Sequence, residues 1–298
     1  MLLKWIATHP LAKYAWNTTV NHCRLLHNLK HKSIPSVIVT WLASFLSDRT
    51  TTLKFDNITT APTPVSTGLP QGSPLSLILY LFYSSDLLTI VPWRSADKLA
   101  AGFIDDMAVA VFSPTVKENV SKLNTLLKAA VDWSQKHACK LDVGKFQLVH
   151  YTRVKDKYSI TPVEFNSVLV APVESAKYLG LILDRHSRWK EQVEESVCKA
   201  TSALLAIAWL TQPTFGMPHW YICQLYTSVV IPKMSYSLAV WFTPVTSIPE
   251  KKCQAGSVGF TRKLGKVQQI ATQLITGGFK LAATDTLEDH ACLPPTLP

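Results

Sequence analysis

Residues 101–112, AGFIDDMAVAVF, place two adjacent aspartates between two short apolar segments. Apolar segments of this length around a polar turn predict a β-hairpin with Asp105 and Asp106 at its tip. Two neighbouring carboxylates repel each other unless a cation lies between them, so a rigid hairpin that carries such a pair indicates a divalent-metal site. The alternative is an ordinary turn, because aspartate is common in turns.

A second turn, Gly68 to Ser76, reads GLPQGSPLS and leads into a long apolar run. Ser73 is expected to cap a helix whose first residue is Pro74. Glycines and free N–H groups at a helix N-terminus let a phosphate or a base pair approach the backbone; the alternative is a plain strand–turn–helix connection. The apolar run, residues 75–93, contains Asp86, which favours a buried helix over a membrane-associated one.

Periodic patterns predict the remaining elements. Helices are expected over residues 21–30, 36–46, 115–138, 187–210, 220–230 and 262–276. Strands are expected over residues 50–56, 145–152 and 163–170. The sequence therefore predicts an α+β chain whose alternating patterns give way to helical ones near residue 185.

Composition narrows the class of partner and the redox compartment. The formal net charge is +10, which suits a polyanionic partner, either nucleic acid or an anionic membrane surface; the equally weighted alternative is a protein that is merely basic. The six cysteines form no CxxC pair and have no histidine at zinc-finger spacing. A reduced intracellular protein in the nucleus or cytoplasm, not a secreted one, is expected.

In this order, the turn at 68–76 and the sequence FIDD at 103–106 resemble the paired motifs of reverse transcriptases. Three further segments resemble those of LINE-like, non-LTR retrotransposons, especially fungal ones: WLASFLSDRTTT at 41–52, KFQLVH at 145–150, and KYLGLILD at 177–184 with a tryptophan five residues later. The similarity extends over nearly the whole chain.

The resemblance implies a right-hand polymerase fold. Residues 1–160 would form partial fingers and a palm, which is an antiparallel sheet with packed helices; residues 161–185 a palm–thumb junction; and residues 186–298 a helical thumb and connection, truncated before any RNase H domain. The implied activity is that of an RNA-directed DNA polymerase, a nucleotidyltransferase that uses Mg²⁺ or Mn²⁺ in two-metal chemistry. The implied partners are an RNA template, a DNA primer and dNTPs, with no membrane and no protein partner.

The resemblance also implies individual roles. Asp105 would be a metal ligand, Asp106 a second ligand or its support, and Lys145 a catalytic group near the nucleotide phosphates. The residues near the templating base and incoming nucleotide would be Pro70, Gln71, Gly72 and Ser73. The residues resembling the primer grip would be Tyr178, Leu179 and Gly180.

One feature of the family is missing. It has a further aspartate on a palm strand ahead of the helix that here reads HCRLLHNL, residues 22–29; the aspartate should fall near Leu11 or Ala12, and no acidic residue precedes Asp48. We therefore expect a truncated copy whose rate is reduced on the order of 10³-fold or more. The alternative is a catalytically inactive remnant that still binds nucleic acid.

Overall fold

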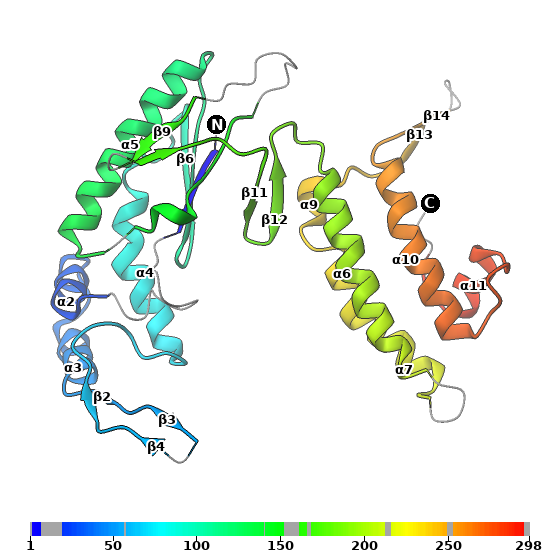
Figure 1. Ribbon diagram of the computed structural model, residues 1–298, viewed down its shortest axis with the longest axis horizontal. Helices are drawn as coiled ribbons and strands as arrows, with labels where there is room; N and C mark the ends of the chain where they lie inside the picture. The colour runs from blue at the N-terminus through cyan, green and yellow to red at the C-terminus, as the bar shows by residue number, and fades with distance from the viewer. Residues whose placement is uncertain are drawn as a thin grey trace. The chain divides into compact units, whose positions relative to one another are not determined.

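The computed structural model describes residues 2–6, 20–56, 58–139, 141–151, 161–165, 168–211, 216–248 and 253–294. The chain divides into two compact units (Figure 1). The first consists of Met1–Gly180 with Asp184–Ser187, and the second of Leu181–Leu183 with Arg188–Pro298.

A four-stranded antiparallel sheet forms the centre of the first unit. Its strands are β1 (Leu2–Ile6), β6 (Lys98–Phe103), β7 (Asp106–Val111) and β8 (Gln147–Val149), in the order β6-β7-β1-β8. The hairpin expected around the two aspartates is β6–β7, in which Phe103 pairs with Asp106. Strand β1 was not expected from the sequence, although it pairs with both β7 and β8.

Four helices accompany this sheet: α2 (His22–His31), α3 (Ser36–Leu46), α4 (Pro74–Leu88) and α5 (Val116–Lys136). All four were predicted, and the mixed helix-and-strand architecture is confirmed. Helix α5 is capped by Thr115, whose side chain accepts the backbone N–H of Glu118 over 3.3 Å.

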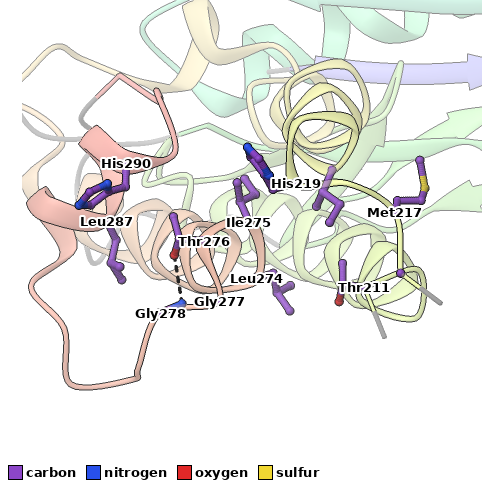
Figure 2. A pocket seen from close by; sticks show the side chains of 12 residues that line it. Thr211, Met217, His219, Leu274, Ile275, Thr276, Gly277, Gly278, Leu287 and His290 are labelled. Atoms are coloured by element: carbon purple, nitrogen blue, oxygen red, sulfur yellow. Dashed lines mark hydrogen bonds between the residues drawn. The ribbon is translucent and has the colours of Figure 1, made fainter. Parts of the chain in front are cut away.

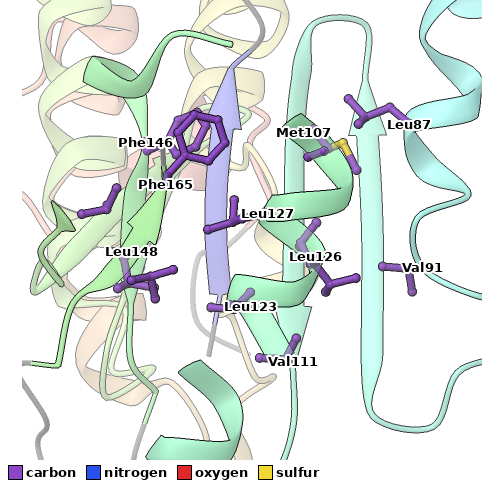
Figure 3. Close-up of a cluster of buried hydrophobic side chains, with 14 of the residues drawn as sticks. Leu87, Val91, Met107, Val111, Leu123, Leu126, Leu127, Phe146, Leu148 and Phe165 are labelled. Atoms are coloured by element: carbon purple, nitrogen blue, oxygen red, sulfur yellow. The ribbon is translucent and has the colours of Figure 1, made fainter. Parts of the chain in front are cut away.

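Helix α5 covers one face of the sheet (Figure 3). Its buried residues Leu123, Leu126 and Leu127 recur at three- and four-residue spacing, which places them on one side of the helix. They pack in one core with the buried residues of β7, among them Val109 and Val111, which are fully buried. Burying each of these side chains contributes about 2 kcal/mol.

Helices α2, α3 and α4 form a second core in the first unit. It contains Leu25, Leu29, Leu42, Leu79 and Tyr83, all nearly or fully buried. Beyond α3 the chain forms two short strand pairs, β2 (Thr50–Thr51) with β5 (Thr63–Pro64) and β3 (Lys54–Phe55) with β4 (Ile58–Thr59). Their residues are exposed.

Three strand predictions were inaccurate. The single strand expected over 50–56 is two short strands, β2 and β3, and between them the N–H of Leu53 donates to the side chain of Thr60. The strand expected over 163–170 is a pair of antiparallel strands, β9 (Val163–Phe165) and β10 (Val168–Val170). The strand expected over 145–152 is shortened to β8, since residues 143–145 form a turn of 3-10 helix.

The second unit is mainly helical. Its helices are α6 (Lys190–Ala208), α7 (His219–Leu225), the π-helical turn η2 (Tyr226–Val230), α8 (Ile231–Met234), α9 (Leu238–Trp241), α10 (Val258–Thr276) and α11 (Thr284–His290). Strands β13 (Thr246–Ile248) and β14 (Cys253–Ala255) of this unit pair with each other. The predicted end of α10 is confirmed at Gly277, whose φ of +68° suits glycine.

The core of the second unit surrounds Tyr226 and Val230, which are fully buried. A cavity of about 740 Å³ opens between the ends of α7, α10 and α11 (Figure 2), where Thr211, His219 and His290 contribute side chains. Two further strands are β11 (Ser175–Tyr178) and β12 (Leu181–Asp184). Over the described ranges, no helix has the length and apolar character needed to cross a bilayer.

Candidate active site

The acid-bearing turn joins β6 to β7. Asp105 lies in the turn, Asp106 is the first residue of β7, and both side chains are partly buried. Ile104 adopts a φ of +54°, which is unfavourable for a β-branched residue. Its side chain packs against the core of α2, α3 and α4, which offsets the cost and fixes the turn against the helices.

Each acid lies near a tyrosine hydroxyl. Burial raises the pKa of Tyr80 on α4, and the charge of Asp105 raises it further. Burial likewise raises the pKa of Tyr178, with an added contribution from Asp106. The Tyr178 hydroxyl also donates to the carbonyl oxygen of Ala101 on β6, over 3.4 Å. The structure therefore brings Tyr178 to the hairpin, and Leu179 and Gly180 follow it in a left-handed turn, with φ of +48° and +82°.

A small cavity of about 180 Å³ lies beside the acid pair. Asp105 and Asp106 line it together with Tyr80 and Ser84 of α4 and Trp133 of α5. The sequence did not single out Tyr80 or Trp133, because both lie in apolar stretches of helices where nothing local distinguishes a cavity-lining residue from a core residue. A cation or a small polar group could reach both carboxylates from this cavity.

Lys145 lies at the same end of the sheet as the acid pair. Gln147 pairs with Lys4, and Lys4 pairs with Ala108 on its other side. Gln147, Lys4 and Ala108 thus lie side by side on β8, β1 and β7. Lys145 comes two residues before Gln147, and Asp106 two residues before Ala108. Because β7 and β8 are both antiparallel to β1, Lys145 and Asp106 lie at the same end of the sheet. The ammonium group of Lys145 is 3.8 Å from the carboxylate of Asp142.

The turn ahead of α4 has the backbone conformation that its glycines suggest. Gly68 and Gly72 have φ of +88° and +85°. The ring of His22 is within hydrogen-bond distance, 2.6 Å, of the Gly68 carbonyl oxygen, and the Ser76 hydroxyl donates to the Pro70 carbonyl over 2.6 Å. These contacts hold the turn at the start of the helix.

Ser73 precedes α4 as expected, but its hydroxyl does not cap the helix. The N–H that it would accept belongs to Ser76, and this N–H donates to the backbone carbonyl of Ser73 instead, over 3.1 Å. Gln71 and Gly72 do not line the cavity beside the acids, to which α4 contributes residues from Tyr80 onward. Tyr80 lies six residues beyond the start of α4, which corresponds to about 9 Å along the helix axis.

The acid pair fits a weakly held Mg²⁺ better than a self-sufficient metal centre. Among the residues that the structure describes, no cluster of three or more His, Cys, Asp or Glu side chains is suited to a metal ion. The residue paired with Asp106 on β1 is Ile6; Leu11 and Ala12 lie outside the described residues. Mg²⁺ is commonly held by one or two carboxylates together with substrate phosphates, and the pair supplies those two carboxylates.

Sequence comparisons with a family model and with known proteins all point to the same family. The model of the family described as reverse transcriptase (RNA-dependent DNA polymerase) matches residues 17–183. The RNA-directed DNA polymerase from mobile element jockey of Drosophila melanogaster is 26% identical over 74% of this chain, and a probable RNA-directed DNA polymerase from transposon BS of the same species is 25% identical over 74%. The chain spans 24% of the length of each of these relatives.

Among solved structures, apo telomerase from Candida tropicalis, truncated from its C-terminal domain, aligns with a TM-score of 0.42 and 14% identity. The alignment covers 61% of this chain and 33% of that one. The family match, by contrast, covers more than half of the chain and includes both the turn at 68–76 and the acid pair. The chain belongs to the reverse transcriptase (RNA-dependent DNA polymerase) family.

Proposed function

We propose that this chain is part of an RNA-directed DNA polymerase of a LINE-like, non-LTR retrotransposon. The sheet and helices of the first unit serve as the palm, and the helices of the second unit as the thumb and connection. The observation that carries the proposal is the hairpin that holds Asp105 and Asp106 at one end of the sheet. The hydroxyl of Tyr178 forms a hydrogen bond to strand β6 of this hairpin. Family membership and the polymerases of mobile elements among its relatives support the same activity.

The substrates are an RNA template, a DNA primer and dNTPs. Asp105 and Asp106 would hold Mg²⁺ or Mn²⁺ jointly with the nucleotide phosphates, and the metal would activate the primer hydroxyl and neutralise charge on the leaving group. Lys145, at the same end of the sheet, contacts the phosphates and can donate a proton to pyrophosphate. The turn that contains Gln71 and Gly72 positions the template base, and Tyr178 positions the primer end.

A second candidate function is nucleic-acid binding without polymerisation. The observation that favours it is the pairing of Asp106 with an isoleucine on β1, since the adjacent strand contributes no carboxylate at that position. Such a remnant would keep the net charge of +10 and its sequence-independent affinity for phosphate backbones.

Primer extension on an RNA template separates the two functions. The full chain, Asp105→Asn and Asp48→Asn are assayed with Mg²⁺ and separately with Mn²⁺. Asp48 is an exposed aspartate, so its substitution makes the same charge change away from the hairpin. Extension by the wild type and Asp48→Asn that is lost in Asp105→Asn supports the polymerase.

Salt-sensitive binding of an RNA–DNA duplex without extension in either metal would reject the polymerase in favour of the remnant. Extension that survives Asp105→Asn would show that another site performs the chemistry.

A further inference from the structure

Two buried donors in the first unit lack a hydrogen-bond partner. Among the described side chains, they are Nε of Arg24 and Nε1 of Trp133. Both side chains line one cavity of about 480 Å³ bounded by α2, α4 and α5. A buried donor without an acceptor is unfavourable, so two of them on residues that line a single cavity point to a site for a hydrogen-bond acceptor.

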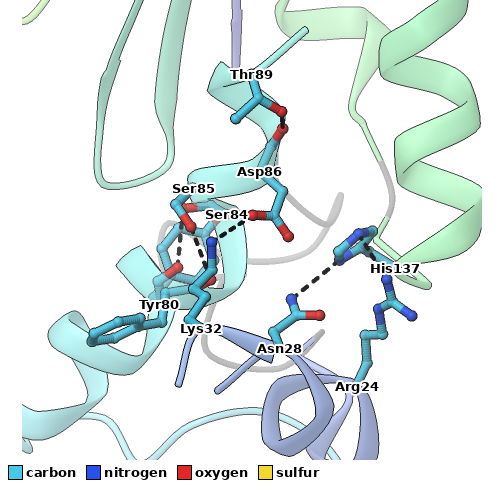
Figure 4. A network of polar contacts seen from close by, with 10 residues as sticks. Arg24, Asn28, Lys32, Tyr80, Ser84, Ser85, Asp86, Thr89 and His137 are labelled. Atoms are coloured by element: carbon cyan, nitrogen blue, oxygen red, sulfur yellow. Dashed lines mark hydrogen bonds and ion pairs between the residues drawn. The ribbon is translucent and has the colours of Figure 1, made fainter. Parts of the chain in front are cut away.

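Arg24 is held at the cavity without a carboxylate partner among the described residues. Its Nη2 atom donates to Nε2 of His137 over 3.3 Å, and Asn28 Nδ2 lies 3.5 Å from Nδ1 of the same ring (Figure 4). Burial, and then the charge of Arg24, lowers the pKa of His137 to about 4. The histidine is therefore neutral near pH 7 and leaves the positive charge of Arg24 uncompensated.

Trp133 is equally constrained. Its ring is 8% exposed and stacks on His137 with a centroid distance of 4.6 Å and an interplanar angle of 16°. The Tyr83 hydroxyl donates to the backbone carbonyl of His137, which fixes the histidine from the other side. Both unpaired donors thus belong to side chains whose positions are set before any ligand arrives, which lowers the entropic cost of binding.

The remaining formal charges at the cavity balance one another. Lys136, His27 and His31 also line it. The carboxylate of Asp86 is neutralised by Lys32, whose ammonium group lies 2.6 Å away. The other two charged residues of the lining, Asp132 and Lys136, carry one negative and one positive charge, so the net positive charge at the cavity is that of Arg24.

We propose that this cavity binds a phosphate group through the guanidinium of Arg24 and the indole N–H of Trp133. The planar fork of arginine matches the geometry of phosphate oxygens, and the indole supplies a second fixed donor. Trp133 also lines the small cavity beside Asp105 and Asp106, so it is a wall shared by the two cavities. Binding here requires neither a metal nor polymerase activity. The phosphate belongs either to a free nucleotide or to a nucleic-acid backbone.

Calorimetric titration of the full chain tests the site. Inorganic phosphate, AMP and a short single-stranded RNA are titrated in phosphate-free buffer into the wild type, Arg24→Gln, Trp133→Phe and Lys30→Gln. Lys30 is exposed on α2, so its substitution removes one charge from the same helix without touching the cavity. We expect Arg24→Gln to weaken binding at least tenfold and Trp133→Phe severalfold, with Lys30→Gln close to the wild type.

The three probes also identify the source of the phosphate. Binding of phosphate and AMP indicates a free-nucleotide site. Binding of RNA alone indicates the backbone, and the slope of log affinity against log salt should then fall by about one in Arg24→Gln only. The proposal is overturned if no probe binds the wild type, or if Lys30→Gln and Arg24→Gln lose affinity equally.

If Arg24→Gln does not fold, the indole N–H signal of Trp133 provides an independent readout. Comparison with the spectrum of Trp133→Phe identifies this signal in the wild type. It must shift on addition of the probe that binds; an unmoved signal would overturn the proposal.

Discussion

Ile6 of β1 is the register partner of Asp106 of β7. Directly paired positions of antiparallel strands lie on the same face of a sheet, with Cβ atoms about 5 Å apart. Position 6 is therefore the position on the neighbouring strand that lies in register with the acid pair. An isoleucine there supplies no ligand atom, whereas a carboxylate would.

Ile6→Asp should raise the affinity of the chain for Mn²⁺ about tenfold, because a third carboxylate adds a ligand to the Asp105–Asp106 pair. The measurement is Mn²⁺ binding by electron paramagnetic resonance. Thr51→Asp, on the exposed strand β2, adds the same charge elsewhere. An equal rise in both variants would show general charge attraction and contradict the geometry.

Gly102 and Leu88 fix how closely β6 approaches α4. A Cβ atom at position 102 would lie 3.1 Å from Cδ2 of Leu88. Because Leu88 is 38% exposed and can move, Gly102→Ala should cost at most about 1 kcal/mol of unfolding free energy, and Gly102→Val clearly more.

Urea unfolding of Gly102→Ala, Leu88→Ala and the double variant measures this contact. The double variant should be more stable than the sum of the single changes predicts, since removal of the leucine side chain makes room for the new methyl group. Strict additivity would mean that the two residues do not constrain each other.

Position 72 requires glycine because of its backbone conformation and not because neighbouring atoms lie close to it. Its φ is +85°, and a Cβ atom there would meet no protein atom within 4 Å. Gly72→Ala should therefore cost about 1–2 kcal/mol of stability, and Gly72→Asn less, because asparagine tolerates this region. Gly277, with φ of +68° and equally open surroundings, is the matched control.

The two glycine variants should differ in ligand binding. If a template base lies against Gly72, then Gly72→Ala weakens binding of an RNA–DNA duplex while Gly277→Ala does not. Equal binding by both variants at equal stability would remove Gly72 from the template site.

The helices and the acid-bearing hairpin were predictable because their signals are local. Apolar residues at three- and four-residue spacing mark α5, and two aspartates between apolar segments mark the β6–β7 turn. Strand β1 was not predictable in the same way. Its place in the sheet comes from pairing with β7 and β8, which are more than 100 residues away, and five residues alone do not specify such a pairing.

The contacts among Arg24, His137 and Trp133 show the same limit. Arg24, His137 and Trp133 come from α2 and from the end of α5, and nothing near each in the sequence indicates that they meet. From the sequence alone, a tryptophan within a helix is interpreted as a core residue. Trp133 is indeed buried, but its unpaired N–H becomes informative only when the cavity around it is known.

His137 makes stability depend on pH in a defined window. Its pKa is lowered from 6.5 to about 4 in the folded protein, by burial first and by Arg24 second. Above pH 6.5 the ring is neutral in both states. Between pH 6.5 and 4 the unfolded chain binds a proton that the folded chain does not, so the free energy of unfolding falls as pH falls. The full effect of this group is roughly 3 kcal/mol.

Urea unfolding of the wild type and His137→Gln at pH 7, 6 and 5 measures this contribution. The pKa of His150 is also lowered by burial, but that residue is present in both proteins and cancels in the comparison. We expect the wild type to lose about 2 kcal/mol more than the variant between pH 7 and pH 5. Parallel pH profiles would mean that His137 takes up a proton equally in the folded and unfolded states, which is incompatible with its burial against the guanidinium of Arg24.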